Sequence, residues 1–204
     1  MGYKSIYARA IKPVVGYFVA LIVLIIVSPI LLFTAAIIVV DSPGPVFFKQ
    51  GRLGMNGRVF LLYKFRSMYH EPSRISNKQT FAGDADVTRV GGIIRRLKID
   101  ELPQLFNVLL GDMALVGPRP SLPNLKEKFD ENGTFRILVK PGLTGLAAVN
   151  GSVFISWPER WVFDRYYVEH LSCWLDLKII FMYSKQETYS RQLKPQSGLQ
   201  PFRL

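Results

Sequence analysis

The feature that most constrains this chain is an uncharged stretch near its start. Residues 13–40 include no Asp, Glu, Lys, Arg or His. A helix of about 20 apolar residues suffices to cross the hydrocarbon core of a bilayer, and this stretch has 28 residues. It is too long for the core of a signal peptide, and residues 39–43 (VVDSP) offer no small-residue cleavage site. The stretch therefore predicts a permanent membrane element.

A Ser28-Pro29 pair falls near the middle of this stretch. Proline removes one helical hydrogen bond and clashes with the preceding turn, so a break or a kink is expected there. Two interpretations follow. In the first, a kinked helix spans the membrane, and the serine hydroxyl satisfies the backbone group that the proline leaves unpaired. In the second, the segment is a re-entrant, helix-break-helix hairpin that enters and leaves the membrane through one face.

Both flanks of the stretch are positively charged. The residues before it carry three bases and no acid: Lys4, Arg9 and Lys12. The residues after it carry one acid, Asp41, and five bases: Lys49, Arg52, Arg58, Lys64 and Arg66. Flanks rich in Lys and Arg stay in the cytoplasm. A spanning helix would export one flank whereas a hairpin keeps both inside, yet the residues alone leave both interpretations open.

The chain as a whole is basic, with a formal net charge of +11. Nucleic acid, anionic lipid and anionic substrate are the usual reasons for such a surplus. The apolar stretch favours a lipid surface, and no aromatic-basic stacking motif points to nucleic acid. The single cysteine, Cys173, excludes an intrachain disulfide and fits a reducing compartment. The two histidines lie far apart in the sequence, which argues against a zinc site.

The remaining sequence alternates short strands with helices, so we predict a mostly helical α+β fold. Residues 45–50 and 58–65 form a β-hairpin whose turn contains Asn56-Gly57. Polar loops are expected at residues 71–86 and 140–145. Helices are expected at 89–99, from Asp100 to Gly111, at 121–129 with Asn132-Gly133 closing it, at 158–170 and at 174–185.

Two of these helices have a predicted orientation. The helix that begins at Asp100 has Pro103 in its first turn and one apolar face, made by Leu102, Leu105, Phe106, Leu109 and Leu110. Residues 174–185 are amphipathic and pack into the core or lie in the membrane interface. The chain then divides into a basic flank with the membrane element (1–42), a cytoplasmic catalytic domain (43–187) with the β-hairpin and interfacial amphipathic helices, and a poorly structured tail (188–204).

The pair Asp100-Glu101 is the strongest candidate for chemistry. A carboxylate can attack phosphorus and form an acyl-phosphate intermediate. The free N–H groups and the dipole at a helix start favour an anion, so Asp100 is expected to stay ionised. Mg²⁺, which takes oxygen ligands and neutralises a pyrophosphate, suits two carboxylates. The alternative is structural: Asp100 caps the helix and Glu101 sits in its first turn, worth about 1 kcal/mol of helix stability.

Four cations are candidates to bind phosphate near this pair. Arg95 lies five residues upstream of Asp100, and Arg119 lies in the Gly-Pro-Arg-Pro turn at 117–120. A guanidinium matches phosphate oxygens in a bidentate way. Lys64 and Arg66 alternate on the second predicted strand and therefore share one face. They point either to the site or to anionic lipid headgroups.

Taken in order, these motifs resemble the monotopic phosphoglycosyl transferases, also called bacterial sugar transferases, in their minimal single-domain form. The resemblance covers residues 10–182. It is carried by the apolar segment with Ser28-Pro29, GPVFFKQGRLG (44–54), YKFRSM (63–68), DVTRVGGIIRRLKIDELPQLFNVLLGDMALVGPRP (86–120), KPGLTG (140–145) and the late Asp164, Tyr166 and Tyr167.

The resemblance implies an activity. Enzymes of this family transfer a sugar-1-phosphate from a UDP-sugar to undecaprenyl phosphate, release UMP, and begin the assembly of a bacterial surface glycan. Asp100 would be the nucleophile that forms a covalent phosphosugar intermediate, with Glu101 assisting and Mg²⁺ required. Arg95 and Arg119 would lie at the phosphate site. Ser28-Pro29 would mark a re-entrant helix at the inner membrane, with the active site on its cytoplasmic face and a homodimer as one option for assembly.

One region departs from the family pattern. After KPGLTG, members often have Trp-Ala-Gln and then Asn-Gly-Arg, where this chain has Leu146-Ala147-Ala148 and then Asn150-Gly151-Ser152. These departures affect the expected sugar or uridine pocket, so no particular sugar is carried over. Two other activities remain open from the sequence: a non-catalytic lipid-binding scaffold of the same fold, and a UDP-sugar pyrophosphatase that needs no lipid acceptor.

Overall fold

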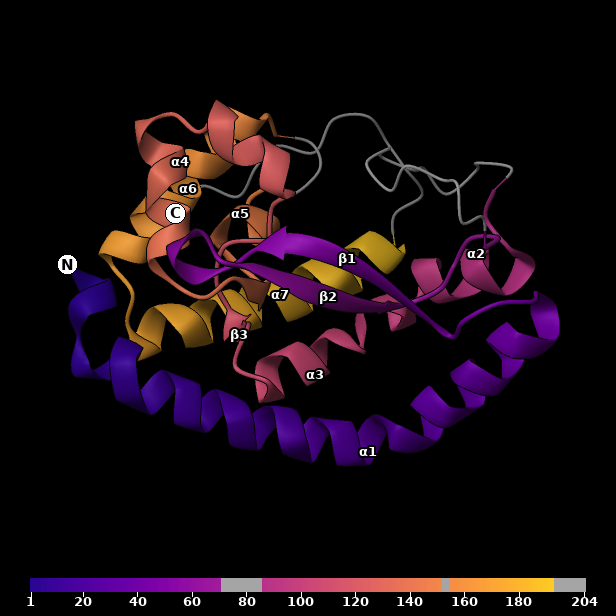
Figure 1. Ribbon diagram of the computed structural model, residues 1–204. Helices are drawn as coiled ribbons and strands as arrows, with labels where there is room; N and C mark the ends of the chain where they lie inside the picture. The colour runs from indigo at the N-terminus through magenta and orange to yellow at the C-terminus, as the bar shows by residue number, and fades with distance from the viewer. Residues whose placement is uncertain (71–85, 152–154, 193–204) are drawn as a thin grey trace.

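The computed structural model describes residues 1–70, 86–151 and 155–192. One long helix, α1 (Lys12–Asp41), runs beneath a small mixed domain, as Figure 1 shows. The described part is mostly helical with two two-stranded sheets, so the predicted α+β class is confirmed. The expected loop at 71–86 falls almost wholly outside the described residues.

Helix α1 follows a 3-10 turn, Gly2–Lys4, and a π-helical turn, Tyr7–Ile11. Its hydrogen-bonded structure continues through Pro29, so the predicted break of the helix does not occur. The physical reason is local. Pro29 has no N–H to offer the carbonyl of Ile25, and the Ser28 hydroxyl donates to that oxygen instead, at 2.8 Å. The helix therefore bends along its length (Figure 1) without being interrupted.

Three apolar clusters bind α1 and the turn before it to the domain along their whole length. Tyr7 packs on the first cluster, Ala20 and Leu24 belong to the second, and Ile38 belongs to the third. In the described part of the chain, residues 7–41 form the one helix long and apolar enough to cross a membrane.

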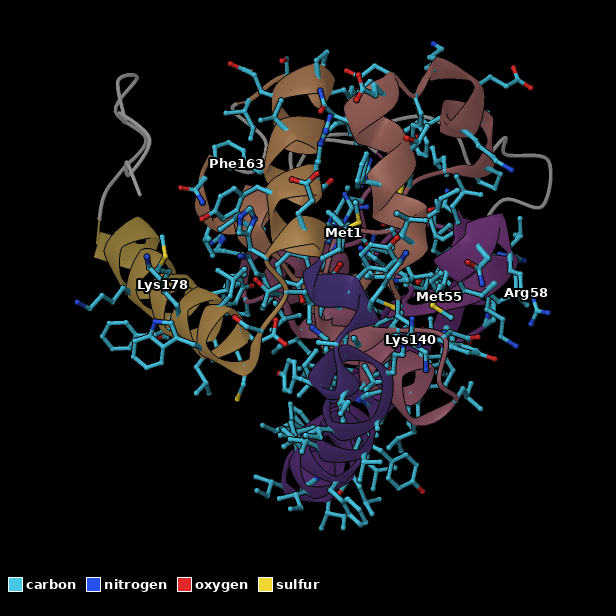
Figure 2. All side chains as sticks on the ribbon, turned by 90° about the vertical axis from the view of Figure 1, so that its left-hand side faces the viewer. Met1, Met55, Arg58, Lys140, Phe163 and Lys178 are labelled. Carbon is cyan, nitrogen blue, oxygen red and sulfur yellow. The ribbon has the colours of Figure 1, made fainter. Side chains whose placement is uncertain are left out.

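The opposite face of α1 is bare. Its exposed side chains are large and apolar, among them Ile22, Ile26, Leu32, Phe33 and Val40, which are 56–88 % exposed. Figure 2 looks along the helix and shows side chains projecting from it, away from the domain, most of them without nitrogen or oxygen. Exposed apolar surface of this extent marks a membrane or protein contact.

The predicted β-hairpin is confirmed. Strands β1 (Phe47–Leu53) and β2 (Val59–Phe65) pair antiparallel, with Leu53 opposite Val59. The connection contains Asn56 (φ 58°) and Gly57 (φ 74°), which adopt the left-handed conformation that this dipeptide favours in tight turns. Strand β1 lies two to three residues later in the sequence than expected.

Arg66 joins the hairpin to the end of α1. Its side chain is buried, and its guanidinium donates to the carbonyls of Ile38, Ser42 and Pro43 at 3.3, 2.5 and 2.6 Å. The last carbonyls of a helix lack intrahelical donors and carry partial negative charge, so a buried arginine stabilises them. Arg66 thus fixes where the membrane helix ends relative to the domain.

Helix α2 (Arg89–Arg96) begins at the Thr88 cap, close to the predicted start. Helix α3 (Gln104–Leu109) does not begin at Asp100. Residues Ile99–Glu101 instead form a separate 3-10 turn, and Pro103 precedes α3 without any side-chain cap. The interpretation of Asp100 as a helix cap is therefore wrong. Gly111, with φ 82°, ends the segment as predicted.

Asn107 decides which face of α3 is buried. Its amide oxygen accepts from the Tyr63 N–H at 3.0 Å, and its amide nitrogen donates to the Leu61 carbonyl at 2.7 Å. The side chain thereby satisfies backbone groups of β2 much as another strand would. Because these bonds hold Asn107 inward, Phe106 and Leu110 are exposed, contrary to the predicted apolar face.

A second sheet was not predicted. Strands β3 (Ala114–Val116) and β4 (Gly142–Thr144) pair in parallel, so part of the expected 140–145 loop is a strand. The approach is close: a Cβ on Gly142 would lie 2.1 Å from the Gly117 nitrogen, and one on Gly145 would lie 2.1 Å from the Gly117 oxygen. Glycine is required at these two positions for that reason.

The upper part of the domain is helical. It contains a 3-10 helix (Pro123–Lys128), α4 (Glu131–Phe135), a 3-10 turn (Arg136–Leu138), α5 (Leu146–Val149) and α6 (Trp157–Glu169). The predicted 158–170 helix is confirmed as α6, which Ser156 and Glu159 begin with a capping box. The prediction that Asn132-Gly133 closes the helix at 121–129 is wrong. The Asp130 side chain caps the start of α4, so Asn132-Gly133 lies inside α4.

The last helix, α7 (Cys173–Gln192), has one face in the core and one exposed. Ile179 is fully buried, whereas Trp174, Leu177 and Phe181 are 77, 54 and 59 % exposed. An exposed apolar face of this kind agrees with the predicted amphipathic helix. Because α7 continues to Gln192, the first five residues of the expected tail are helical. Residues 193–204 lie outside the described part.

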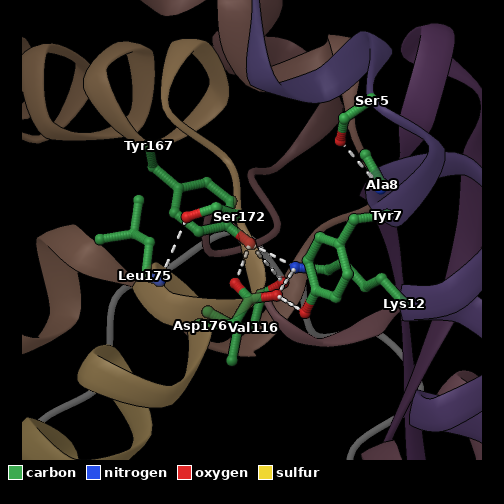
Figure 3. Close-up of polar contacts among 9 residues, drawn as sticks. All are labelled: Ser5, Tyr7, Ala8, Lys12, Val116, Tyr167, Ser172, Leu175 and Asp176. Atoms are coloured by element: carbon green, nitrogen blue, oxygen red, sulfur yellow. Dashed lines mark hydrogen bonds and ion pairs between the residues drawn. The ribbon is translucent and has the colours of Figure 1, made fainter.

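A buried polar cluster, centred on Asp176 of α7, joins the two ends of the chain (Figure 3). Its carboxylate accepts from the hydroxyls of Tyr7 and Tyr167 and pairs with Lys12, each at 2.7 Å. The Lys12 ammonium also donates to the Tyr167 hydroxyl. The cluster lies between α1, α6 and α7, so it holds the start of α1 against the rest of the domain.

We predict that Asp176→Ala strongly destabilises the fold. The substitution removes the common acceptor of three donors and leaves the Lys12 ammonium, whose side chain is 13 % exposed, without its counter-ion. Breaking a buried pair in this way costs about 3–5 kcal/mol. Urea unfolding of the detergent-solubilised protein, followed by tryptophan fluorescence, measures the change. Glu127→Ala, at an exposed position, is the control and should stay within about 0.5 kcal/mol of wild type; equal stability of both variants would contradict the role of Asp176.

Candidate active site

Asp100 and Glu101 lie together in the short 3-10 turn between α2 and α3. Lys98, with a left-handed φ of 56°, ends the α2 segment and sends the chain into this turn. The turn faces the hairpin because Asn107 holds α3 against β2. Neighbouring side chains on a regular helix diverge. This short irregular turn instead allows the carboxylates of Asp100 and Glu101 to serve one site.

Glu101 is held by two cations from different elements. Its Oε1 atom lies 2.7 Å from Nζ of Lys64 on β2 and 2.8 Å from Nη2 of Arg119 in the turn after β3. Burial alone would raise the pKa of Glu101, but Arg119 and Lys64 outweigh it and hold that pKa well below its usual range. Glu101 is therefore a fixed anion that orients both cations.

Asp100 has a different environment. Among the described residues it makes no ion pair, and burial raises the pKa of its carboxyl, with Glu101 adding to the rise. Lys64 and Arg95 act in the opposite direction without overcoming burial. The net direction is opposite to the one expected from a helix start. Two adjacent carboxylates thus differ in basicity, which is typical of groups with different roles in one site.

Arg95 reaches the site from the last turn of α2. Its Nε atom donates to the Ser67 hydroxyl at 2.7 Å. Ser67 also anchors α2 through its backbone, because its carbonyl accepts from the Thr88 N–H at 3.2 Å. Sequence reasoning missed Ser67, although it lies in the YKFRSM motif, beside the predicted cation.

Three of the four predicted cations are thus brought to the carboxylates: Lys64, Arg95 and Arg119. Arg66 is not among them. Its guanidinium donates to the carbonyls at the end of α1, so the alternation that places Lys64 and Arg66 on one face of β2 does not give them one function.

Two arginines that sequence reasoning missed fix the turn that carries Arg119. Arg52 donates to the Pro120 carbonyl at 3.2 Å, and Arg136 donates to the Arg119 carbonyl at 2.6 Å. Burial, with Arg119 adding, lowers the pKa of Arg52 to about 10. The GPVFFKQGRLG motif contains Arg52, but no local pattern marks an arginine whose donors serve distant backbone carbonyls.

Asp164 supports this arrangement from α6. It is buried and lies 3.1 Å from Nε of Arg136. Burial raises the pKa of Asp164, although Arg136 and Arg160 oppose the rise. Of the late motif, Asp164 thus orients the arginine that holds Arg119, and Tyr167 belongs to the buried cluster around Asp176. Asp164 and Tyr167 thus support the structure from within the domain.

The carboxylate pair fits Mg²⁺ by its donor chemistry. No group of three or more His, Cys, Asp or Glu side chains suited to a metal occurs in the described part of the chain. Oε1 of Glu101 already receives two cationic donors. An all-protein cage is therefore absent there, whereas Mg²⁺ commonly takes one or two carboxylates and completes its shell with water and substrate phosphate.

The residues that depart from the family pattern have separate places. Leu146 is buried in the core cluster with Tyr167, and its backbone begins α5. Ala147 and Ala148 line a cleft next to Arg119. Ser152 lies outside the described residues.

Comparisons with known proteins show the family of the chain. The family model described as "Bacterial sugar transferase" matches residues 7–188. An undecaprenyl-phosphate glucose phosphotransferase of Komagataeibacter xylinus is 45 % identical over 184 residues, which cover 84 % of this chain and 35 % of the relative. An uncharacterized sugar transferase, EpsL, of Bacillus subtilis is 46 % identical over 161 residues, covering 79 % of each chain.

A third relative names both substrates. The UDP-glucose:undecaprenyl-phosphate glucose-1-phosphate transferase of Escherichia coli is 38 % identical over 182 residues, covering 85 % of this chain and 39 % of the relative. The chain thus spans little more than a third of the Komagataeibacter and Escherichia proteins but most of the Bacillus one. Because the family model extends over most of the residues, the chain belongs to the bacterial sugar transferase family.

Proposed function

We propose that this protein transfers a sugar-1-phosphate from a UDP-sugar to undecaprenyl phosphate, with release of UMP. The observation that carries the proposal is the carboxylate pair, with Asp100 made basic by burial and Glu101 fixed between Lys64 and Arg119. The names of the Komagataeibacter and Escherichia relatives support the same overall reaction.

The reaction runs in two displacements at phosphorus. In the first, an Asp100 oxygen attacks the β-phosphorus of the UDP-sugar, the bond to the bridging oxygen breaks, and UMP leaves with that oxygen. The sugar phosphate is then joined to Asp100 as an acyl phosphate. In the second, a phosphate oxygen of undecaprenyl phosphate attacks the same phosphorus, and Asp100 leaves as a carboxylate. The lipid product is a diphosphate that carries the sugar.

The cations of the site stabilise the negative charge that these steps involve. Arg119 and Lys64 are already oriented by Glu101, so their positions need no reorganisation when substrate binds. Arg95, held by Ser67, acts on Asp100 itself. When bound by Asp100 and Glu101, Mg²⁺ would supply further neutralisation of the pyrophosphate.

We further infer that α1 is re-entrant, with both ends on the cytoplasmic face of the inner membrane. A helix of 30 residues is about 45 Å long. A spanning orientation would separate much of it from the domain, yet α1 and its preceding turn pack on the domain from Tyr7 to Ile38. The bend of α1 and its basic flanks agree with a helix that enters the membrane only partway and leaves it on the same side.

The surface around α1 supports the same placement. Helices α2 and α3 pack on α1, and each exposes apolar side chains. These side chains are Ile93, Leu97, Phe106 and Leu110, which are 39–65 % exposed. An active site next to such a surface lies at headgroup level, where the phosphate of a lipid acceptor also lies. Bound membrane lipid would therefore cover this face.

We predict that Asp100→Asn reduces turnover by a factor on the order of 10³ or more, as expected for loss of a nucleophile. The purified protein is incubated with UDP-sugar, Mg²⁺ and undecaprenyl phosphate, and UMP is measured. With donor alone, wild type should carry one sugar phosphate on the peptide that contains Asp100, detected by mass spectrometry, and the variant should carry none. Glu127→Gln, at an exposed position, is the control.

The same experiment separates the alternatives. A pyrophosphatase releases many equivalents of UMP without lipid acceptor. A lipid-binding scaffold releases none under any condition. Turnover that persists in Asp100→Asn would remove the nucleophilic role.

A second prediction concerns pH. Lys64 lowers the pKa of Asp100 because a cation favours the ionised carboxylate, and only the ionised form attacks phosphorus. Lys64→Met should therefore raise that pKa, so activity on acidification is lost at a higher pH than in wild type. The acid limb of kcat/KM against pH measures this. Lys49→Met, on the neighbouring strand β1 and exposed, should leave the limb in place; a limb that moves to lower pH in Lys64→Met would contradict the assignment.

A third prediction tests the path of α1. On a Cys173→Ser background, Lys4→Cys and Pro45→Cys place exposed thiols before and after the helix. A membrane-impermeant maleimide should label both in inverted vesicles and neither in spheroplasts. Labelling of Lys4→Cys in spheroplasts but not of Pro45→Cys would show a spanning helix.

A further inference from the structure

A cleft opens beside Arg119, next to the carboxylate site. It lies, open to solvent, between the turn that carries Arg119 and helices α5 and α6. Ala147 and Ala148 of α5 form part of one wall, and Trp157 and Arg160 of α6 form part of another. Arg119 lines the cleft and also pairs with Glu101. A ligand bound in the cleft at Arg119 would therefore lie next to the carboxylate site.

The cleft is positively charged. Three guanidinium groups line it, those of Arg119, Arg136 and Arg160, against one carboxylate, that of Asp164. Burial lowers the pKa of Arg160, and the neighbouring Arg119 lowers it further. Two guanidinium groups that disfavour each other's charge form a site for an anion, which relieves the repulsion.

One wall of the cleft holds an unsatisfied donor. Arg136 is 6 % exposed; its Nε pairs with Asp164 and its Nη2 donates to the Arg119 carbonyl. Its Nη1 atom is buried and has no hydrogen-bond partner among the described residues. A buried donor without an acceptor is costly, but this atom is closed off from solvent, so what Arg136 adds to the cleft is its positive charge.

The rest of the lining suits a flat ring. Trp157 is 41 % exposed, and the Arg160 guanidinium lies 4.7 Å from the centre of its indole ring. Ala147 and Ala148 add only small side chains to the lining. The cleft therefore combines an aromatic-guanidinium wall with a cationic end at Arg119, as a ligand with a planar ring and a phosphate requires.

We propose that this cleft binds the UMP portion of the donor, with its phosphate at Arg119 and Arg160 and its base along the Trp157 wall. The inference rests on the proposed function and adds to it the place of the leaving group. The hexose is uncharged in most nucleotide sugars and does not account for an excess of guanidinium groups, whereas the leaving nucleotide is an anion. Cleavage would then occur at the shared Arg119, between this cleft and Asp100.

The test is direct binding of UMP to the full-length protein in lipid nanodiscs, by titration calorimetry without acceptor. Arg160→Gln should weaken UMP binding by roughly tenfold or more, as expected for loss of a charge-assisted contact. The matched control is Arg165→Gln on the same helix, whose guanidinium pairs with Glu131 and Glu169 outside the cleft. Its UMP affinity should equal that of wild type.

A second variant tests the cleft without changing charge. Ala148→Trp fills the space, so UMP binding should fall while the thermal unfolding temperature stays near that of wild type. A sugar-1-phosphate serves as the competing probe. If Arg160→Gln or Ala148→Trp weakens its binding and leaves UMP binding unchanged, the cleft holds the sugar and the proposal is overturned.

Failure of the cleft proposal and failure of the proposed function have different signatures. Unchanged UMP affinity in both cleft variants, with normal wild-type transfer from UDP-sugar to lipid, overturns only the place of UMP. A wild-type protein that neither binds UMP nor consumes UDP-sugars overturns both.

Discussion

The rest of the fold depends on helix α1, which has one face against the domain and one exposed apolar face. One face of α1 packs on the domain from end to end, and its other face is bare and apolar. A helix that is apolar all round is normally buried on all sides. Here protein covers one side, and in the proposed placement the membrane covers the other. The Asp176 cluster at one end and Arg66 at the other fix the helix to the domain. In the proposed placement, these contacts set the depth of the candidate site in the membrane.

The candidate active site is built by contacts between side chains of different elements. Asn107 holds α3 on β2, which brings Glu101 to Lys64; Arg52 and Arg136 hold the turn that brings Arg119 to the same carboxylate. The carboxylate-cation network of Glu101, Lys64 and Arg119 is thus already formed before any ligand binds. Preorganised charge of this kind is what phosphoryl transfer needs, because the protein contributes mainly position and electrostatic stabilisation.

The sequence predicted the elements whose signals are local. The Asn56-Gly57 hairpin, the α2 and α6 helices and the Gly111 stop follow from turn chemistry and caps, and the structure confirms them. Strands β3 and β4 were missed because each has only three residues, too few to show an alternation of apolar and polar side chains. The faces of α3 were misjudged for a physical reason: the usual rule assumes that water covers the exposed side, whereas Phe106 and Leu110 adjoin a helix whose outer face is apolar.

The sequence predicted which residues form the candidate site, but it did not predict the different role of each residue. The motifs identified the site residues Asp100, Glu101, Lys64, Arg95 and Arg119. In the sequence Lys64 and Arg66 are equivalent, but in the structure Arg66 binds the carbonyls at the end of α1. The contrast between the two carboxylates also depends on tertiary structure: Glu101 has two cations within 3 Å, and Asp100 has none paired to it among the described residues. If the paired carboxylate orients the cations and the unpaired one remains basic, the nucleophile is the carboxylate that the fold leaves without a partner. The pairing pattern therefore gives the assignment of Asp100 a physical basis beyond the motif itself.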